Sequence, residues 1–449
     1  MNNFKSYVDS HREQFIAELQ EFCHQPSVAA QNWGLREMAQ KVLARLQKLG
    51  AEARLIEVQG GAPVVYGEIG SGERTLMIYD HYDVQPPEPL DLWETGPWNA
   101  AMRDGKIFAR GVADNKGNLM CRIQAIEAYR AAIGPLPLKI KFVVEGEEEI
   151  GSVHLPQFVK ENRALLGADG CLWEAGYKDI DERPVLSCGL KGIVYVELRA
   201  RGAKRDLHSA AAAIVGNPAW RLTWALATLK DTHDNILIDD FFNHVRAPTA
   251  AEMDALEAIP FDEEKVKAEY GIRAFVNDLT GIELLKKYLY EPTCTICGLY
   301  SGYIGEGSKT VLPNHAFAKI DFRLVPNLTP DLVVDLVKKH LARRGFDDIE
   351  IVLTETGEEV ARSPLDAPIV RAAIEAMKAV YPNAPVIYPT MSGSGPMYPL
   401  CQQLGIPAVG AGCGLHDSRG HAPNENIRIA DYFEGISFVR ELIDRFAKM

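Results

Sequence analysis

The sequence predicts an α/β protein, in which a main domain with a doubly wound, mostly parallel sheet is interrupted by an inserted α+β domain of ferredoxin-like topology. Two patterns favour this class. Short apolar segments alternate with helical segments near both ends of the chain, and the middle follows the order strand, helix, strand, strand, helix, strand. The length of 449 residues also exceeds what one hydrophobic core usually supports, so two domains are expected.

The first part of the chain alternates helices with short strands. Apolar residues recur at helical spacing over residues 4–23, and a second amphipathic helix stops at Gly50. The predicted elements are helix 4–23, helix 35–49, strand 64–69, strand 75–80, helix 116–132, strand 138–145 and strand 170–174. This alternation is typical of a largely parallel sheet with helices on both faces, where functional groups gather beyond the carboxyl ends of the strands.

The middle of the chain has the order of a split βαβ domain. Its predicted elements are strand 192–201, helix 217–230, strand 293–299, strand 315–325, helix 329–344 and strand 348–354, with an insertion over roughly 232–292. The α/β pattern then resumes with helix 365–380, strand 385–389, strand 407–411 and helix 429–448. We therefore place the main domain at residues 1–188 and 359–449, and the inserted domain at residues 189–358.

The composition argues against several classes of protein. The net charge of −13 disfavours nucleic-acid binding, because phosphates select basic surfaces. No apolar run approaches the ~20 residues of a membrane span, and the first residues lack the apolar segment of a signal peptide. Eight scattered cysteines favour a reducing compartment over a disulfide scaffold, so we expect a cytoplasmic protein.

Acidic and imidazole side chains lie at or just after the ends of several apolar segments. They are His81 and Asp83, Asp114, Glu148 and Glu149, Glu174 and, near the C-terminus, His421. Each has an ordinary interpretation when taken alone: a surface turn, a helix N-cap or a solvated acidic run. Together the carboxylates would repel one another without a cation, and two histidines with several carboxylates suit a pair of Zn²⁺ or Mn²⁺ ions. Asp114 is the candidate for the bridging carboxylate.

Six motifs, in this order along the chain, carry a resemblance to a known family. They are DHYDVQP, RGVADNKG, EGEEEIGS, DLHSA, SKTVLPNHAFAKIDFRLVPNLTP and HAPNE. Over nearly the whole chain the sequence resembles the dinuclear metallohydrolases that include carnosine-type dipeptidases, aminoacylases, carboxypeptidase G and succinyl-diaminopimelate desuccinylase. The segment 308–330 is most similar to the carnosine-type dipeptidase branch. The resemblance implies that the main domain is catalytic and that the inserted domain is a lid and dimerisation domain.

The resemblance also implies a metal centre. His81 would bind one metal ion and His421 the other, Asp114 would bridge the two ions, and Glu149 and Glu174 would complete the ligands. The cofactors would be two divalent ions per subunit, with Zn²⁺ as the first choice and Mn²⁺ or Co²⁺ as alternatives.

Two neighbouring carboxylates would have other roles. Glu148 matches the general base of the family, and Asp83 matches the acid that orients His81. Glu148 would take a proton from a water shared by the metals and return it to the leaving amine. The peptide bond between Asp114 and Asn115 would be cis, as is typical of that family.

The substrate site implied by the resemblance draws on the inserted domain. His208 matches a histidine that stabilises the oxyanion from the partner subunit of a homodimer. Arg323 would receive the substrate carboxylate through its fork of donors. Further hydrogen bonds to the substrate carboxylate would come from Thr310, Gly393 and Ser394. The last two lie in the motif MSGSGP, which departs from the double glycine that precedes the serine in that family.

The substrate class has more than one interpretation. Segment 308–330 favours a dipeptidase, whereas Glu174 favours an acylase or a carboxypeptidase, because dipeptidases of the family tend to carry Asp at that ligand. We expect hydrolysis of an amide bond in a small substrate with a free α-carboxylate: a dipeptide first, with an N-acyl-amino-acid deacylase or a carboxypeptidase as the alternative. A catalytically silent metal- or metabolite-binding relative is the remote alternative.

Two further features receive no catalytic role. Cys294 and Cys297 form a CxxC without a second pair, so we expect both thiols to be structural. His416 and Asp417 lie close to His421 in sequence, and their spacing leaves a supporting role and a plain loop equally open.

Overall fold

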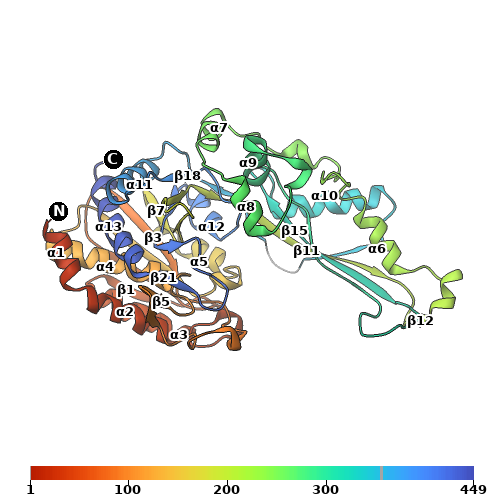
Figure 1. Cartoon of the computed structure of the whole chain (residues 1–449), viewed down its shortest axis with the longest axis horizontal. Coiled ribbons are helices and arrows are strands. Elements are labelled where there is room, and N and C mark those ends of the chain that lie inside the picture. Colours follow the sequence, from red (N-terminus) through yellow and green to blue (C-terminus); the bar gives the residue numbers. More distant parts are fainter. Residues whose placement is uncertain (1, 354–356) are drawn as a thin grey trace. The chain divides into compact units, whose positions relative to one another are not determined.

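The structure, a computed structural model, describes residues 2–353 and 357–449. The chain forms two compact units (Figure 1). The first contains the residues up to Gly189 together with Arg362–Thr390 and Pro396–Met449. The second contains Leu190–Ala361 and the short segment Met391–Gly395.

The first unit is built on an eight-stranded mixed sheet. In spatial order its strands are β1 (Glu52–Ile56), β2 (Val64–Ile69), β6 (Lys139–Glu145), β3 (Thr75–His81), β7 (Gly170–Trp173), β19 (Ala408–Gly410), β9 (Val185–Ser187) and β18 (Val386–Tyr388). The four central strands run parallel, as predicted. The pairs β1–β2, β2–β6 and β19–β9 are antiparallel. Sequence patterning missed β1, because its side chains are exposed or half-buried and carry no apolar run.

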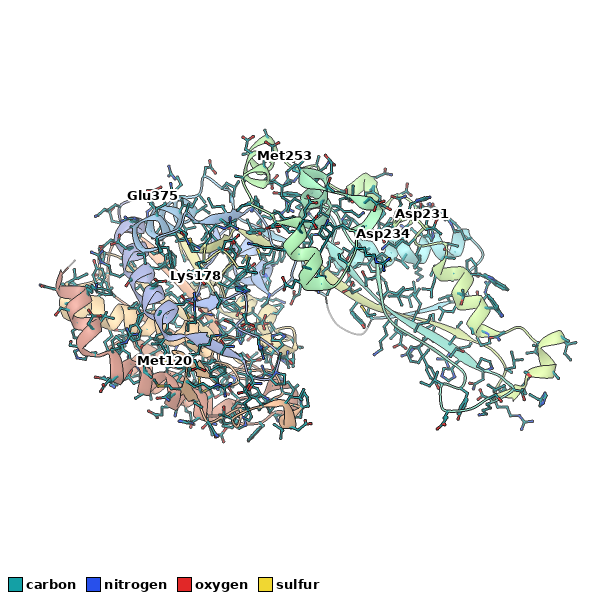
Figure 2. The ribbon with its side chains drawn as sticks, viewed as in Figure 1. Met120, Lys178, Asp231, Asp234, Met253 and Glu375 are labelled. Carbon is teal, nitrogen blue, oxygen red and sulfur yellow. The ribbon has the colours of Figure 1, made fainter. Side chains whose placement is uncertain are left out.

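Helices cover both faces of this sheet. On one face, Ile78 and Phe142 join a buried cluster with residues of six helices. Those helices are α1 (Asn2–Ser10), α2 (Arg12–His24), α3 (Leu35–Lys48), α4 (Lys116–Ala132), α11 (Pro368–Val380) and α13 (Ile429–Phe446). Met120 of α4, labelled in Figure 2, is fully buried there. The segment after α5 (Leu155–Asn162) covers the other face, where Lys141 of β6 donates a hydrogen bond to the carbonyl of Leu165.

The first predicted helix, over residues 4–23, is in fact two helices. The break falls at His11, whose backbone leaves helical geometry. Ser10 Oγ donates to the carbonyl of Tyr7, and His11 Nδ1 lies 2.8 Å from the same oxygen. Polar side chains that bind nearby carbonyls compete with the helical ladder, which accounts for the interruption.

A small antiparallel sheet in the first unit brings distant parts of the chain together. It contains β4 (Ala101–Arg103), β5 (Lys106–Phe108) and β21 (Asn426–Arg428). Asn426 pairs with Phe108, so the segment that follows His421 lies beside the segment that leads to Asp114. These strands have three residues each and carry no periodic signal, and the sequence did not predict them.

The second unit has the ferredoxin-like topology that the sequence predicted. Its four-stranded antiparallel sheet has the spatial order β13 (Thr295–Ser301), β15 (His315–Leu324), β11 (Gly192–Arg201) and β16 (Glu350–Leu353). The crossover helices are α6 (Pro218–Leu226) and α10 (Pro330–Arg343). Residue 354 of the expected strand 348–354 lies outside the described residues.

The insertion between α6 and β13 is helical, as expected. It contains α7 (Ala250–Glu257), α8 (Glu263–Tyr270) and α9 (Gly281–Tyr290). A separate pair of short strands, β12 (Leu207–His208) and β14 (Val311–Leu312), lies antiparallel in the same unit. Within residues 2–353 and 357–449, none of the helices combines the length and apolar character that crossing a bilayer requires.

Candidate metal centre

Three parallel strands deliver most of the candidate ligands. In the sheet, β3 lies between β6 and β7, and all three run in the same direction. His81 is the last residue of β3, Glu174 directly follows β7, and Glu148 and Glu149 open the 3₁₀ turn that follows β6. The carboxyl ends of adjacent parallel strands meet at one edge, so the sheet itself gathers these side chains.

The ligand candidates form two groups that share one carboxylate. His81 Nε2 lies 3.1 Å from Asp114 Oδ1 and 3.2 Å from Glu174 Oε2. His421 Nε2 lies 3.1 Å from Asp114 Oδ2 and 3.0 Å from Glu149 Oε2. Asp114 thus points one oxygen toward each histidine, the arrangement that a carboxylate bridging two ions requires.

The donor set fits divalent metal ions. A tetrahedral zinc site with bonds of about 2.0 Å has edges of about 3.3 Å, close to the spacings between these donors. Glu174 Oε2 is buried and, apart from its close contact with His81 Nε2, has no hydrogen-bond partner within the described parts of the chain. Such an atom is costly in a folded protein unless a cation or proton accompanies it. Donor atoms within 4.8 Å of one another also join Glu148 to His81 and Glu174.

The protonation of the cluster reflects its crowded negative charge. Burial, followed by the charges of nearby carboxylates, raises the pKa of Glu148 and of Glu174 well above the ordinary value. Hydrogen bonds to Asp114 and Glu149 raise the pKa of His421 to about 10. Burial alone would lower the pKa of His81, but Glu174, Asp114 and Asp83 outweigh it and raise that pKa well above its usual value. Without metal the cluster therefore holds protons, and bound cations would take their place.

Asp83 connects His81 to the acidic turn. Its buried carboxylate accepts hydrogen bonds from the backbone N–H groups of Glu148 at 3.3 Å and Glu149 at 3.0 Å. Its Oδ1 also lies 3.4 Å from His81 Nδ1, on the ring nitrogen opposite the ligand nitrogen. Asp83 therefore fixes the imidazole and the turn together.

Sequence reasoning assigned no role to Glu425, which holds the turn that carries Asp114. Its Oε1 accepts from the N–H groups of Ala113 at 2.8 Å and Asp114 at 3.0 Å. Its Oε2 accepts from Gly111 N–H at 2.9 Å and from Arg110 Nη1 at 2.8 Å. The signal was present in the HAPNE motif, but only the tertiary fold places its acid against a turn more than 300 residues away.

A second network that the sequence did not predict holds Asn115, the residue after Asp114. The Asp114–Asn115 peptide bond is cis, as the resemblance implied. Asn115 Nδ2 and Arg122 Nη1 both donate to Asp80 Oδ1, at 2.8 and 2.9 Å. The buried Arg122 also donates to the carbonyl of Trp173, the residue before Glu174, at 2.6 Å. This arginine ties the end of β3 to the end of β7.

The sequence also assigned no role to Gln85. Its Nε2 donates to Glu149 Oε2 at 2.9 Å and to the Glu149 carbonyl at 3.2 Å. Glu149 is thereby held with one oxygen directed at His421.

The expected substrate residues fall into two groups within the second unit. Arg323 Nη1 donates to Ser394 Oγ at 2.8 Å, and Gly393 lies next to that serine. His208 pairs with Val311 across β12 and β14, which places it beside Thr310. The structure therefore brings together Arg323, Gly393 and Ser394, and separately His208 and Thr310.

These two groups lie at opposite ends of the same sheet. Arg323 pairs with Ile193 at one end of the β11–β15 ladder, and His315 pairs with Arg201 at the other. The strand β12 follows that second end, where Gly202 N–H donates to the Asn314 carbonyl. Eight residues of extended strand span about 27 Å. Within one chain, His208 is thus far from Arg323.

The remaining features of the sequence lie outside the cluster. Cys294 is buried just before the edge strand β13, Cys297 is exposed on that strand, and all eight cysteines are free. His416 donates its backbone N–H to the carbonyl of Lys178, a residue labelled in Figure 2. Neither CxxC nor His416 belongs to the donor groups found among the described residues.

Comparison with known proteins identifies the family. The model of peptidase family M20/M25/M40 matches residues 77–445. The Beta-Ala-His dipeptidase of Rattus norvegicus is 27% identical over 460 residues, covering 96% of this chain and 92% of the relative. The Cys-Gly metallodipeptidase dug1 of Schizosaccharomyces pombe is 30% identical over 355 residues, covering 75% and 74%.

A solved structure shares the whole fold. The M20 family metallo-carboxypeptidase Sso-CP2 from Sulfolobus solfataricus is 38% identical, with a TM-score of 0.92 over 97% of this chain and 99% of its own. The resemblance expected from the motifs, nearest the carnosine-type branch, is confirmed by these matches. The chain therefore belongs to peptidase family M20/M25/M40 and is a metallopeptidase.

Proposed function

We propose that this enzyme hydrolyses the amide bond of small peptides that end in a free α-carboxylate, with dipeptides as the first substrate class. The observation that carries the proposal is the pair of donor groups around Asp114, with Glu148 beside them. His81, Asp114 and Glu174 would hold one ion, and His421, Asp114 and Glu149 the other.

We assign the proton transfer to Glu148. Two bound divalent ions would supply Lewis-acid activation of the attacking water and of the scissile carbonyl. Glu148 would accept the proton of that water and deliver it to the leaving amine. Glu149, its neighbour, directs its Oε2 at His421 and is committed as a ligand, so the two acids have different tasks. Asp83 would keep His81 oriented through Nδ1.

We propose Zn²⁺ as the native metal. Imidazole nitrogen with carboxylate oxygen is a common zinc set, and a shared carboxylate with open positions suits catalysis. Mn²⁺ and Co²⁺ can use the same donors, and reconstitution of the metal-free protein with each ion distinguishes them.

We propose that Arg323 and Ser394 receive the substrate carboxylate, assisted by Gly393. The Arg323 side chain is 32% exposed, and its fork of donors suits two carboxylate oxygens. His208 and Thr310 would act on the same substrate from a partner subunit. The β11–β15 ladder between Arg323 and the end nearer His208 spans about 27 Å, which supports this, because one copy could not reach both ends.

The second unit also offers a surface for a homodimer. Trp220 and Trp224 stack at 5.9 Å on α6, and both are more than half exposed. The edge strand β13 exposes Ile296 and Leu299 and, among the strands of residues 2–353 and 357–449, pairs only with β15. Exposed aromatic side chains and an open strand edge are features that a second copy would cover.

Mixing two inactive variants tests action in trans. Dimers that combine His208→Ala with Glu148→Gln chains would carry one complete site, so activity should return after subunit exchange. Exchange that is demonstrated by mass but restores no activity would contradict a role for His208 from the partner.

Two activities remain close candidates. The curated relatives are a Beta-Ala-His dipeptidase and a Cys-Gly metallodipeptidase, whereas Sso-CP2 is described as a metallo-carboxypeptidase and is 38% identical. Both activities need the free carboxylate, but only a dipeptidase needs the free amine. A matched set of one dipeptide, its N-acetyl form, its C-terminal amide and an N-terminally extended tripeptide separates them.

The substrate set has defined outcomes. Cleavage of the free dipeptide alone indicates a dipeptidase, and cleavage of the acetylated and extended forms indicates a carboxypeptidase. N-acetyl and N-succinyl amino acids, added to the same screen, test the deacylase alternative. Inactivity toward all of them with each metal present would favour a silent relative.

The mechanism is tested at Glu148. Glu148→Gln removes the proton acceptor but keeps the side-chain volume, so turnover should be lost while close to two metals per chain remain. Retained turnover would refute the role of Glu148.

We also propose a cytoplasmic location, which the eight free cysteines support because free thiols persist in reducing compartments.

A further inference from the structure

The short segment 391–395, which carries Ser394, makes a β-bridge from Met391 to Leu190 of the second unit and three further hydrogen bonds to it. Ser392 Oγ donates to Tyr288 Oη at 2.8 Å. Gly393 accepts a hydrogen bond at its carbonyl from Lys191 N–H at 2.9 Å. Ser394 Oγ accepts from Arg323 Nη1 at 2.8 Å.

One of these hydrogen bonds comes from the helical insertion. Tyr288 lies on α9, the last helix of the insertion before β13. The Tyr288 side chain is half exposed, and its hydroxyl accepts the hydrogen bond from Ser392, two positions before Ser394. Ser392 is also the residue at which this chain departs from the glycine expected from the family resemblance.

Lys191 fixes the end of the same helix. Its buried ammonium donates to the carbonyl of Tyr288 at 2.8 Å and to the carbonyl of Glu291 at 2.6 Å. The last carbonyls of a helix lack partners within the helix and carry partial negative charge, so a cation is favourable there. Through its N–H and its ammonium, Lys191 thus fixes both Gly393 and α9.

We propose that the insertion helix α9, through Tyr288, positions Ser394 and thereby sets how the enzyme recognises the substrate carboxylate. This inference rests on the proposed role of Arg323 and Ser394. Tyr288 is a positioning residue: it acts through Ser392 and does not itself contact the substrate. The helical insertion would then help to determine substrate specificity, in addition to packing against the sheet of the second unit.

The geometry explains why a flexible loop would not serve. Segment 391–395 contains two glycines and joins Thr390 to Pro396, both of which belong to the first unit. Glycine has the widest range of backbone conformations, so an unfastened segment would lose more entropy on binding a ligand. Anchors on both sides of Gly393 hold Ser394 against Arg323 before the substrate arrives, which lowers that cost.

The test compares Tyr288→Phe, Ser392→Ala and the double variant in the metal-loaded enzyme. Loss of one positioning hydrogen bond should raise KM for the best free-carboxylate substrate about threefold to tenfold, with kcat within about twofold. Because both residues serve one contact, the double variant should be no worse than either single variant. Tyr300→Phe, which removes a hydroxyl from β13 of the same unit, is the matched control and should keep the wild-type KM.

Hydrogen–deuterium exchange gives a readout that does not depend on turnover. Amides of segment 391–395 should exchange faster in Tyr288→Phe than in the wild type or in Tyr300→Phe, while peptides from α10 stay unchanged. Unchanged KM together with unchanged exchange overturns the inference, and so do additive effects of the two substitutions. Wild-type inactivity toward every free-carboxylate substrate would overturn the proposed function instead, and the exchange result would then decide the anchoring by itself.

Discussion

Replacing Glu425 with glutamine should weaken both the folded state and the metal centre. Glu425 is completely buried and accepts four hydrogen bonds, from the N–H groups of Gly111, Ala113 and Asp114 and from Arg110. An amide can keep only one acceptor atom. Since its oxygen would stay with Arg110, its NH₂ group would face the N–H groups of Ala113 and Asp114, where donors meet donors.

The magnitude follows from the loss of a buried ion pair and of the two hydrogen bonds that one carboxylate oxygen accepts. Removing the charge of one partner of a buried pair costs about 3–5 kcal/mol. That is a large part of the total stability of about 5–15 kcal/mol that is typical of a folded domain. Residues that orient metal ligands typically contribute about 10- to 100-fold to metal affinity, and the displaced turn carries Asp114 itself.

The assay separates the two effects. Urea unfolding of the chelated protein measures stability without the contribution of bound metal, and a metal titration then measures affinity. Glu57→Gln is the matched control, because Glu57 binds Arg36 through two hydrogen bonds at 3.0 and 2.7 Å but on the surface, where solvent screens the pair. A loss below about 1 kcal/mol in Glu425→Gln, with wild-type metal affinity, would refute the reasoning.

Three further outcomes follow from the metal centre and the second unit. Glu174→Ala should leave about one metal per chain after dialysis, whereas Asp114→Ala should lose both, as measured by elemental analysis of the protein. At pH 7 metal uptake should release at least two protons, because the pKa values of His81 and His421 are raised in the metal-free protein and ligand imidazoles must be neutral. Calorimetry in buffers of different ionisation enthalpy counts the released protons, and the metal affinity should fall as the pH falls. Trp224→Asp should shift the sedimentation of the protein toward the monomer with metal content unchanged, and a wild-type sedimentation profile would argue against α6 as the interface.

The central fold could be predicted because its signals are local. Strands β3 and β6 are short apolar runs, and parallel neighbours bring their carboxyl ends to one edge. His81, Glu148, Glu149 and Glu174 gather there for that reason. The alternation of strands and helices likewise predicted the ferredoxin-like order of the second unit.

Other elements carry no such signal. The strand β1 is mostly polar, and β5 and β21 have three residues each, so neither periodicity nor length distinguishes them from loops. The helix break at His11 depends on side-chain bonds to a nearby carbonyl, which compete with a helix that the apolar spacing favours.

The sequence by itself determined the family, the two-part α/β organisation and the residue types of a two-metal centre, because these depend on short ordered motifs and on the local period of apolar residues. Only the tertiary structure decided that Glu425 holds the turn of Asp114, that Arg122 ties two strand ends, and that Tyr288 supports the segment of Ser394. Each of these contacts joins residues between 50 and more than 300 positions apart. Hydrogen bonds between residues so distant in sequence depend on where the folded backbone places the donor and the acceptor. Sequence spacing therefore does not predict these bonds.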